Sequence, residues 1–109
     1  MKKKEIIKKS KDFTELITNS KYLKTNEYII YYKDNNLDKK RFGIAISNKI
    51  GNAVTRNKLK RQTREIIDKL KYLFKNNMDY IIMIRKGAKN STFKDKLINL
   101  EKILKENNQ

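Results

Sequence analysis

One amphipathic stretch in the second half of the chain constrains the fold most. At about 100° per residue, its mostly apolar side chains fall on a single stripe, which is the pattern of a helix with one buried side. The members of this stripe are Leu59, Thr63, Ile66, Ile67, Leu70, Leu73 and Phe74. Gly51 and Asn52 precede it, and an Asn side-chain oxygen can accept a hydrogen bond from the free N–H groups of a first helical turn. The sequence therefore predicts a helix from Asn52 to about residue 74.

The same helix carries a second stripe, which is basic. Arg56, Lys60 and Arg64 stand at i, i+4 and i+8, and Asn57 and Arg61 widen the stripe. Like charges at this spacing destabilise an isolated helix by roughly 0.2–0.5 kcal/mol per pair unless an anion lies against them. Three of the five arginines in the chain lie in this helix, and the planar fork of arginine suits phosphate. We therefore interpret the stripe as a polyphosphate-binding surface rather than a solvated face.

The charge balance of the whole chain also favours a nucleic-acid partner. There are 28 Lys plus Arg against 12 Asp plus Glu, which gives a formal net charge of +16 over 109 residues. A strongly basic balance in a small domain is typical of a nucleic-acid binder. An A/T-rich genome would account for many lysines, but it would not suppress glutamate.

The residue types that are missing restrict the chemistry. The chain has no Cys and no His, which excludes disulfides, thiolate zinc sites and histidine bases. Its acidic residues are scattered, with no D-x-D or E-x-x-E cluster, so we expect no catalytic residue and no metal ligand. The apolar runs are far shorter than the roughly 20 residues of a membrane span, and the basic N-terminus lacks the apolar region of a signal peptide. We therefore expect a cytoplasmic protein without a membrane partner.

The first half of the chain predicts a short helix followed by strands. Residues 1–9 are expected to form a mobile basic arm, because a terminus without a buried anchor is usually poorly ordered. Ser10 would cap a helix that ends near Asn19. Residues 22–25 would connect this helix to a strand at 27–33, which is rich in aromatic and β-branched residues.

Alternation along the strand at 27–33 assigns its side chains to two faces. One face takes Tyr28, Ile30 and Tyr32, and the other takes Ile29 and Tyr31. Residues 34–40 are predicted to form a hairpin loop before a returning strand at 41–47. The small side chains of that strand, Gly43, Ala45 and Ser47, share one face and leave space beside the sheet.

The second half adds one strand and a closing helix. Residues 75–78 make a turn, and 79–85 form a continuous apolar run, which is typical of a strand buried on both faces. Gly87 ends this strand. Ser91 or Thr92 would then cap an amphipathic helix that reaches near residue 106.

Together these elements predict an α+β fold of one domain spanning residues 1–109. A mostly antiparallel sheet packs with helices in a sandwich, in the order α-β-β-(β)-α-β-α. The basic helix makes a βαβ crossover, and such crossovers are right-handed in about 98% of cases.

The segment from Ser47 to Glu65, S-N-K-I-G-N-A-V-T-R-N-K-L-K-R-Q-T-R-E, resembles the signature of the protein subunit of bacterial ribonuclease P. The similarity continues through K-D-F-T-E-L-I at 11–17, E-Y-I-I-Y-Y at 27–32, R-F-G-I-A-I-S at 41–47 and D-Y-I-I-M-I-R-K at 79–86. It covers nearly the whole chain in order.

The resemblance implies a small protein that assists a ribozyme in removing the 5′ leader from precursor tRNA. In that family the RNA subunit performs the endonucleolytic chemistry with Mg²⁺, and the protein positions the leader and the RNA. The expected partners are therefore ribonuclease P RNA and precursor tRNA, with no DNA. The resemblance also implies a left-handed crossover around the basic helix.

The family pattern assigns the RNA-subunit contacts to the basic helix and the residue just before it. Its Arg-Asn-Arg motif falls on Arg56, Asn57 and Lys58, so lysine replaces the third arginine and loses the bidentate fork. The full expected set is Lys49, Arg56, Asn57, Lys58, Lys60, Arg61 and Arg64.

The family pattern also implies a cleft for the single-stranded leader between the first helix and the sheet. Its aromatic lining falls on Phe13 and Tyr31, with Ile17 where an aromatic residue is common, and Ile29 and Ala45 would shape the floor. Stacking on an aromatic side chain contributes roughly 1–3 kcal/mol per base and tolerates any sequence. The alternative is that Phe13 and Tyr31 are core residues.

Three other functions are compatible with parts of the pattern. A ribosomal or other basic RNA-binding protein of similar small α+β fold would share the charge and the basic helix. A metal-dependent nuclease acting alone would need the paired acids that the sequence lacks. A helix-turn-helix DNA-binding protein would need a short Gly-containing turn between two helices, which is absent.

Overall fold

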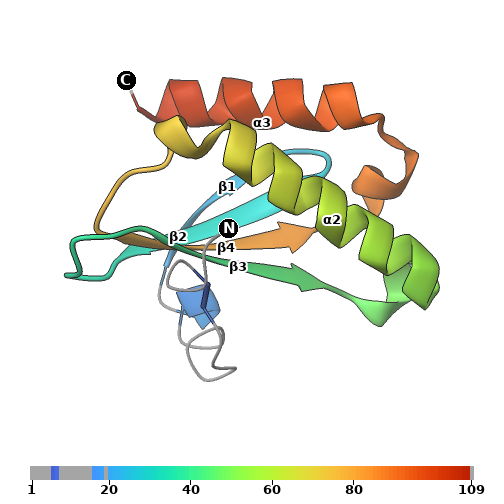
Figure 1. The fold of residues 1–109 in the computed structure, drawn as a ribbon, viewed down its shortest axis with the longest axis horizontal. Coiled ribbons are helices and arrows are strands. Elements are labelled where there is room, and N and C mark those ends of the chain that lie inside the picture. The colour runs from blue at the N-terminus through green and yellow to red at the C-terminus, as the bar shows by residue number, and fades with distance from the viewer. Residues whose placement is uncertain (1–5, 8–15, 19, 109) are drawn as a thin grey trace.

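The computed structural model describes residues 6–7, 16–18 and 20–108, and Figure 1 shows the arrangement of the chain. The strands are β1 (Lys21–Lys24), β2 (Tyr28–Asp34), β3 (Arg41–Ile46) and β4 (Met78–Ile84). The helices are α2 (Ala53–Lys69) and α3 (Phe93–Asn107), and short 3-10 turns lie at η2 (Asn48–Ile50), η3 (Lys71–Leu73) and η4 (Lys86–Asn90). Residues 16–18 are helical and belong to the first predicted helix. The order α-β-β-β-α-β-α confirms the predicted fold class.

The four strands form one mixed sheet in the order β1-β2-β4-β3. β2 runs antiparallel to β1 and to β4, whereas β3 runs parallel to β4. The parallel pair is joined through α2, which confirms the βαβ unit around the basic helix. The hand of this crossover stays a prediction from the family resemblance.

The position of β4 shows that one prediction was wrong. Residues 34–40 do not form a hairpin loop, because β4 lies between β2 and β3. Ile81 and Ile82 point to opposite faces of β4 and both are 0% exposed, as expected of a strand with neighbours on both edges and cover on both faces. The 34–40 segment instead passes the start of β4, where the Asn35 N–H donates to the Asn77 carbonyl at 2.8 Å.

A second correction concerns the segment at 22–25, which was predicted to be a plain connection. Lys21–Lys24 form the edge strand β1, in register with residues 29–32 of β2. Only Leu23 packs against the main core, so the segment lacks the apolar content of a typical strand. Charged side chains of this kind are common on edge strands, because they discourage further pairing.

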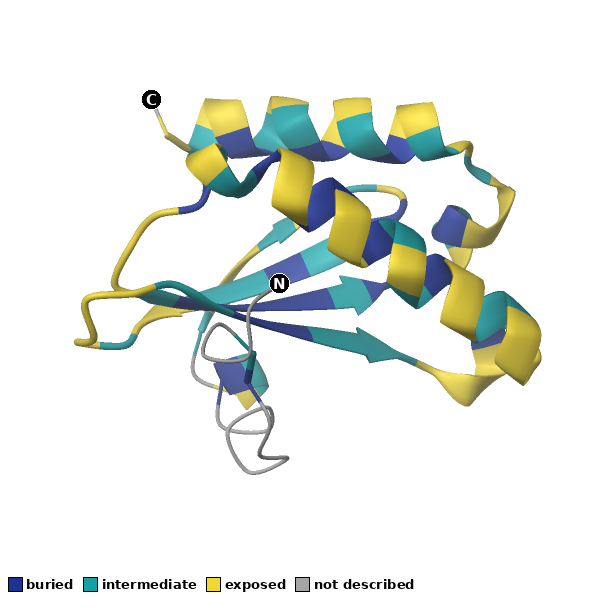
Figure 2. Cartoon of the chain, in the orientation of Figure 1, coloured by how far each residue is buried: buried dark blue, intermediate teal, exposed yellow. Residues whose placement is uncertain are grey.

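α2 and α3 cover one face of the sheet, and their buried residues lie on the sides of the helices that face it (Figure 2). Asn52 caps α2 as predicted, accepting from the Thr55 N–H at 2.9 Å. Thr92 is the residue that caps α3, and it accepts from the Asp95 N–H at 3.0 Å. Both caps satisfy donors that would otherwise lack partners in the first helical turn.

α2 ends at Lys69, earlier than the predicted end near residue 74. The apolar stripe continues beyond that point because Leu70 and Phe74 remain buried through the η3 turn. Phe74 packs edge-on against the rings of Phe42 and Tyr80, with centroids 5.0 Å and 4.8 Å away. These ring contacts return the chain to the sheet where β4 begins.

The opposite face of the sheet carries a smaller apolar cluster of Ile7, Leu16 and Ile81. Within the segment 1–9, which was predicted to be a mobile arm, the two described residues are anchored. Ile6 bridges to Phe42, and the Ile7 N–H donates to the Phe42 carbonyl at 2.8 Å. The sheet is therefore covered on both faces, by two helices on one side and by N-terminal segments on the other.

Candidate nucleic-acid interface

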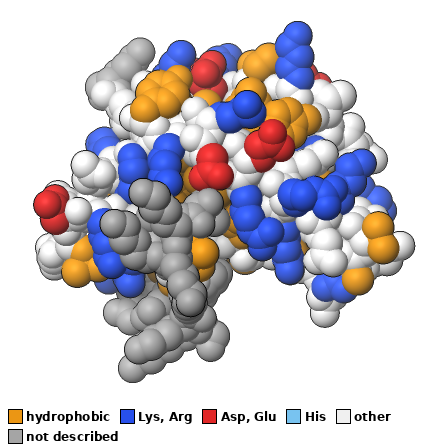
Figure 3. Space-filling model, in the orientation of Figure 1, with side chains coloured by type: hydrophobic (Ala, Val, Ile, Leu, Met, Phe, Trp, Pro, Cys, Tyr) orange, Lys and Arg blue, Asp and Glu red, His pale blue; other side chains and the backbone are white. Residues whose placement is uncertain are grey.

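The basic side chains predicted to bind RNA form a row along α2. At 100° per residue, Arg56, Lys60 and Arg64 span about 80° of the helix surface, directly beside the buried stripe. Arg61 extends the row toward solvent and is exposed, as is Arg64. Figure 3 shows Lys and Arg side chains gathered over this helix.

The turn before α2 ties Lys49 to this row. The Ser47 hydroxyl caps η2 by accepting from the Lys49 N–H at 3.2 Å. The side-chain carbonyl oxygen of the neighbouring Asn48 accepts a hydrogen bond from the Arg56 guanidinium. The bond between Asn48 and Arg56 therefore ties the η2 turn, which contains Lys49, to the first turn of the helix.

Protein groups do not neutralise this row within the part of the chain that the structure describes. The side chains of Lys49, Lys60, Arg61 and Arg64 make no ion pair or hydrogen bond there. Arg56 pairs only with the neutral Asn48 side chain. Within the described residues, the fold itself therefore does not relieve the mutual repulsion of these cations.

Lys58 lies apart from the row. It is 200° around the helix from Arg56, and it lines a groove of about 620 Å³ between α2 and the start of α3. Lys89 and Lys96 line the same groove. Lys96 is buried, and it donates to the Gln62 side chain at 3.1 Å and to the Ser91 carbonyl at 2.6 Å.

Burial lowers the pKa of Lys96, the buried carboxylate of Glu27 opposes this shift, and Lys58 adds to it. Burial also raises the pKa of Tyr28 to about 12, against the hydrogen bond with Thr63, and raises that of Tyr80. These tyrosines lie in the main core.

The predicted leader-binding residues that the structure describes share the sheet face away from α2 and α3. Ile17, Tyr31 and Ala45 are partly buried and pack against the cluster of Ile7, Leu16 and Ile81. Ile29 lies two residues before Tyr31 and so points to the same face. Phe13 lies outside the described residues. The structure thus brings four of the five predicted residues to one face.

Strand register places these side chains in rows across the sheet. Tyr31 lies opposite Ile81, which in turn lies opposite Gly43. The adjacent row joins Ile29 to Met83 and Met83 to Ala45. Because Gly43 and Ala45 are small, the β3 end of these rows has little side-chain bulk, as the alternation in the sequence predicted.

Sequence reasoning missed one aromatic residue on this face. Tyr22 of β1 lies opposite Tyr31 in the register, and the two ring centroids are 6.1 Å apart at an interplanar angle of 50°. Tyr22 is 61% exposed. The alternation of Tyr22 and Lys24 around Leu23 was the available signal, but the segment is too short and too rich in lysine to indicate a strand.

No three Asp, Glu, His or Cys side chains come together as metal ligands in the stretches 6–7, 16–18 and 20–108. Among the same residues, no helix is both long and apolar enough to cross a membrane. What the geometry offers is a row of cations on one surface and an apolar and aromatic sheet face on the other.

Comparison with known proteins decides between the candidate RNA-binding families. A family model described as Ribonuclease P matches residues 1–108. The chain belongs to the ribonuclease P protein family.

Relatives in this family are similar over nearly their whole length. The ribonuclease P protein component of Mycoplasma mycoides is 42% identical over 109 residues, which cover 96% of this chain and 100% of the relative. That of Streptococcus thermophilus is 36% identical, and the match covers 96% of this chain and 94% of the relative.

Solved structures of the family share the fold. The ribonuclease P protein of Staphylococcus aureus superposes with a TM-score of 0.83 at 34% identity, and 94% of each chain is covered. That of Thermotoga maritima gives a TM-score of 0.83 at 28% identity, covering 94% of this chain and 96% of that one. The sheet and helices described above are therefore those of ribonuclease P proteins.

Membership establishes what the chain does at the level of the complex. It is the protein component of ribonuclease P, an endoribonuclease whose catalysis resides in RNA and which matures the 5′ end of tRNA. Its partners are ribonuclease P RNA and precursor tRNA. The ribosomal and stand-alone nuclease alternatives are set aside on this finding.

Proposed function

We propose that the two surfaces divide the work of the ribonuclease P protein between two RNAs. The row on α2, with Lys49, binds the RNA subunit, and the sheet face that carries Tyr31 binds the 5′ leader of precursor tRNA. The observation that carries this division is chemical contrast: unneutralised cations lie on one surface, and partly exposed apolar and aromatic side chains lie on the other. Folded RNA presents phosphate, whereas a single strand presents unstacked bases.

The proposed contact with the RNA subunit rests on charge and geometry. Arg56, Lys60, Arg61 and Arg64 extend from one rigid helix, and Lys49 and Asn57 flank them. Arginine can hold two phosphate oxygens at once, whereas lysine acts as a point charge. Lys58 completes the motif in sequence but lies on the α3 flank, so its contact requires the RNA to reach around α2.

The proposed leader site rests on the shape of the sheet face. Tyr31 is held by its packing against the Ile7–Leu16–Ile81 cluster, so its ring is positioned before any base arrives. Ile17 and Ile29 border it, and Ala45 leaves room on the β3 side. An apolar face with a fixed ring accepts a base of any identity, as variable leaders require.

We infer that the Mg²⁺ of the holoenzyme is held by RNA phosphates rather than by dedicated protein ligands. Mg²⁺ prefers several oxygen ligands, usually carboxylates or phosphates. The acidic side chains in the described ranges form no group of three that would supply them. Family membership also supports a cytoplasmic location, where precursor tRNA is made.

Reconstitution tests the proposal as a whole. Candidate ribonuclease P RNAs would be mixed with the full chain at low Mg²⁺, and cleavage of a leader-bearing precursor tRNA would be measured. We expect the protein to restore leader removal by its matching RNA. A protein that cleaves the precursor without any RNA subunit, or that leaves every RNA inactive, would contradict it.

Two substitutions separate the surfaces. Tyr31→Ala should weaken binding of leader-bearing precursor by the assembled enzyme by roughly 1–3 kcal/mol, because one stacking platform is lost, while mature tRNA binds as before. Arg61→Ala should weaken assembly with the RNA subunit and so affect both tRNAs alike. Each variant needs an unchanged melting midpoint. If a folded Tyr31→Ala protein keeps the parental ratio of the two affinities, the leader lies elsewhere.

A further inference from the structure

The most exposed aromatic side chain near the leader face is Tyr22, on the edge strand β1. Its position opposite Tyr31 places both rings on the same face of the sheet. Tyr31 is partly buried against the N-terminal cluster, whereas Tyr22 is 61% exposed. Of the two adjacent rings, the outer one therefore offers the larger free surface.

Exposure alone would not distinguish Tyr22, since single exposed apolar side chains are normal. Tyr72, in η3 on the helical side of the molecule, is 68% exposed and has no ring neighbour among the described residues. Tyr22 differs because its ring lies 6.1 Å from that of Tyr31. The two rings make a continuous aromatic edge that begins at the partly buried side and runs out to solvent.

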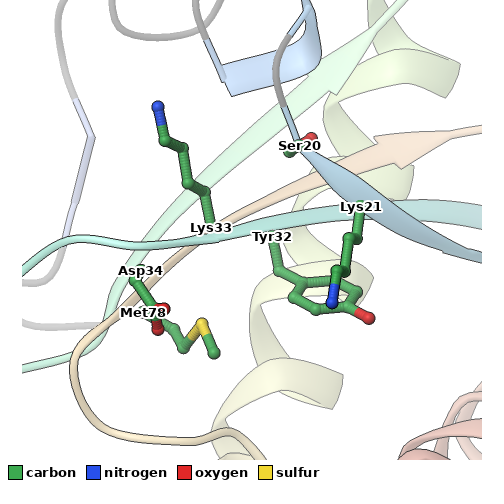
Figure 4. A pocket seen from close by; sticks show the side chains of 6 residues that line it. All are labelled: Ser20, Lys21, Tyr32, Lys33, Asp34 and Met78. Atoms are coloured by element: carbon green, nitrogen blue, oxygen red, sulfur yellow. The ribbon is translucent and has the colours of Figure 1, made fainter.

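Lysines border this aromatic edge on the same face. Lys24 follows Tyr22 by two residues, and Lys33 follows Tyr31 by two residues, so strand alternation puts both on the leader side. Figure 4 shows Lys33 on the opposite side of β2 from Tyr32 and Lys21. Lys24 and Lys33 are both exposed. Aromatic rings flanked by cations are the arrangement that binds single-stranded nucleic acid, with bases on the rings and phosphates on the cations.

We propose that Tyr22 is a second stacking platform for the leader, which extends the site from Tyr31 across β1. This inference rests on the proposed leader site. It also gives a physical account of Ile17, which cannot stack as an aromatic residue does: the chain has an additional ring beside Tyr31. The leader would then cross the strands toward the β1 edge of the sheet.

The test compares variants of the full chain, each assembled with its RNA subunit. Affinities for a long-leader precursor and a leaderless tRNA would be measured for Tyr22→Ala, Tyr22→Leu and Tyr22→Phe. Tyr22→Ala and Tyr22→Leu should reduce the long-leader preference by about 5- to 150-fold, because the ring is lost. Tyr22→Phe should keep the preference, because stacking needs no hydroxyl. Tyr72→Ala is the matched control and should leave it unchanged.

The outcomes separate this inference from the proposed leader site. If Tyr31→Ala lowers the preference while folded Tyr22→Ala and Tyr22→Leu do not, Tyr22 is a surface residue and the inference is overturned alone. If Tyr31→Ala is also without effect, the leader site itself is wrong. A loss in Tyr22→Phe equal to that in Tyr22→Ala would assign the effect to the hydroxyl and overturn stacking. As a folding control, each variant is compared only if its melting midpoint equals that of the parent protein.

Discussion

A single carboxylate joins three segments at one end of the sheet. Asp79 of β4 accepts from Arg41 of β3 through two bonds, Nε to Oδ1 at 2.8 Å and a terminal nitrogen to Oδ2 at 2.6 Å. Asn35, in the segment after β2, adds a bond of 2.8 Å to Oδ1. The Asp79 side chain is 11% exposed. The pair therefore links the parallel strands where solvent screens it poorly.

Asp79→Asn should lower the free energy of unfolding by about 1–3 kcal/mol, because the amide keeps only one of the two acceptor oxygens and removes the negative charge that pairs with Arg41. Urea unfolding at neutral pH measures this change. Asp38→Asn is the control, since Asp38 is an exposed acid in the same loop, and a surface change of this kind should stay within about 0.5 kcal/mol. Equal effects of the two substitutions would show that the pair of Asp79 and Arg41 adds nothing to the free energy of unfolding.

At the scale of elements, α2 presents different cations to its two flanks. Lys60 lies in the row beside Arg56 and Arg64, whereas Lys58 faces the groove toward α3. Removing one phosphate-binding cation from an RNA interface reduces the slope of log affinity against log salt by about 0.7–0.9. We expect this reduction for Lys60→Ala and a smaller one for Lys58→Ala, measured by titration with the RNA subunit over a range of salt.

Lys60→Ala and Lys58→Ala each remove one positive charge from α2. The two variants therefore have the same net charge, and each serves as the control for the other. A full reduction of the slope in Lys58→Ala would mean that the RNA reaches around α2 to the α3 flank. Helical content should be unchanged in both.

α2, α3 and β4 could be predicted from sequence because their signals are local. The apolar stripe that begins at Leu59 and the caps at Asn52 and Thr92 are each recognised from residues that are close together in the sequence. Strand order could not be predicted in the same way. That β4 pairs with both β2 and β3 depends on pairing between residues far apart in the chain, and nothing within residues 34–40 signals it.

The candidate site shows the same limit. The placing of Arg56, Lys60 and Arg64 on one stripe follows from helical periodicity, whereas the position of Lys58 beside the groove toward α3 becomes visible only once α3 is in place. Tyr31 was predicted from the family pattern. Tyr22 was not, because its position beside Tyr31 depends on the register of β1 against β2, which the residues Lys21–Lys24 do not specify by themselves.

At the scale of the whole molecule, the chain carries a net charge of +16 and is small, with a radius of gyration of 13.1 Å. The screening length is about 30 Å at 0.01 M salt and about 8 Å at 0.15 M. Repulsion therefore acts across the entire molecule at low salt and only between near neighbours at the higher concentration. We expect the melting temperature to rise with NaCl, by about 4–8 °C for each kcal/mol of repulsion removed.

Sodium sulfate at matched ionic strength is the control for this prediction. If screening alone acts, the two salts raise the melting temperature equally. If the folded state also binds anions, sulfate raises the melting temperature more than chloride does. A melting temperature that is constant or falls with NaCl would show that repulsion does not limit stability.

The central place of β4 also determines when the chain can fold during synthesis. β2 and β3 leave the ribosome first, and each has an edge that only β4 can fill. At about 5–20 residues per second, the segment 47–77 delays the arrival of β4 by a few seconds. During that interval the nascent chain holds two apolar strands without their common partner, and their basic surroundings disfavour contact with other nascent copies. A transcript that ends before Met78 therefore encodes a chain that cannot complete its sheet.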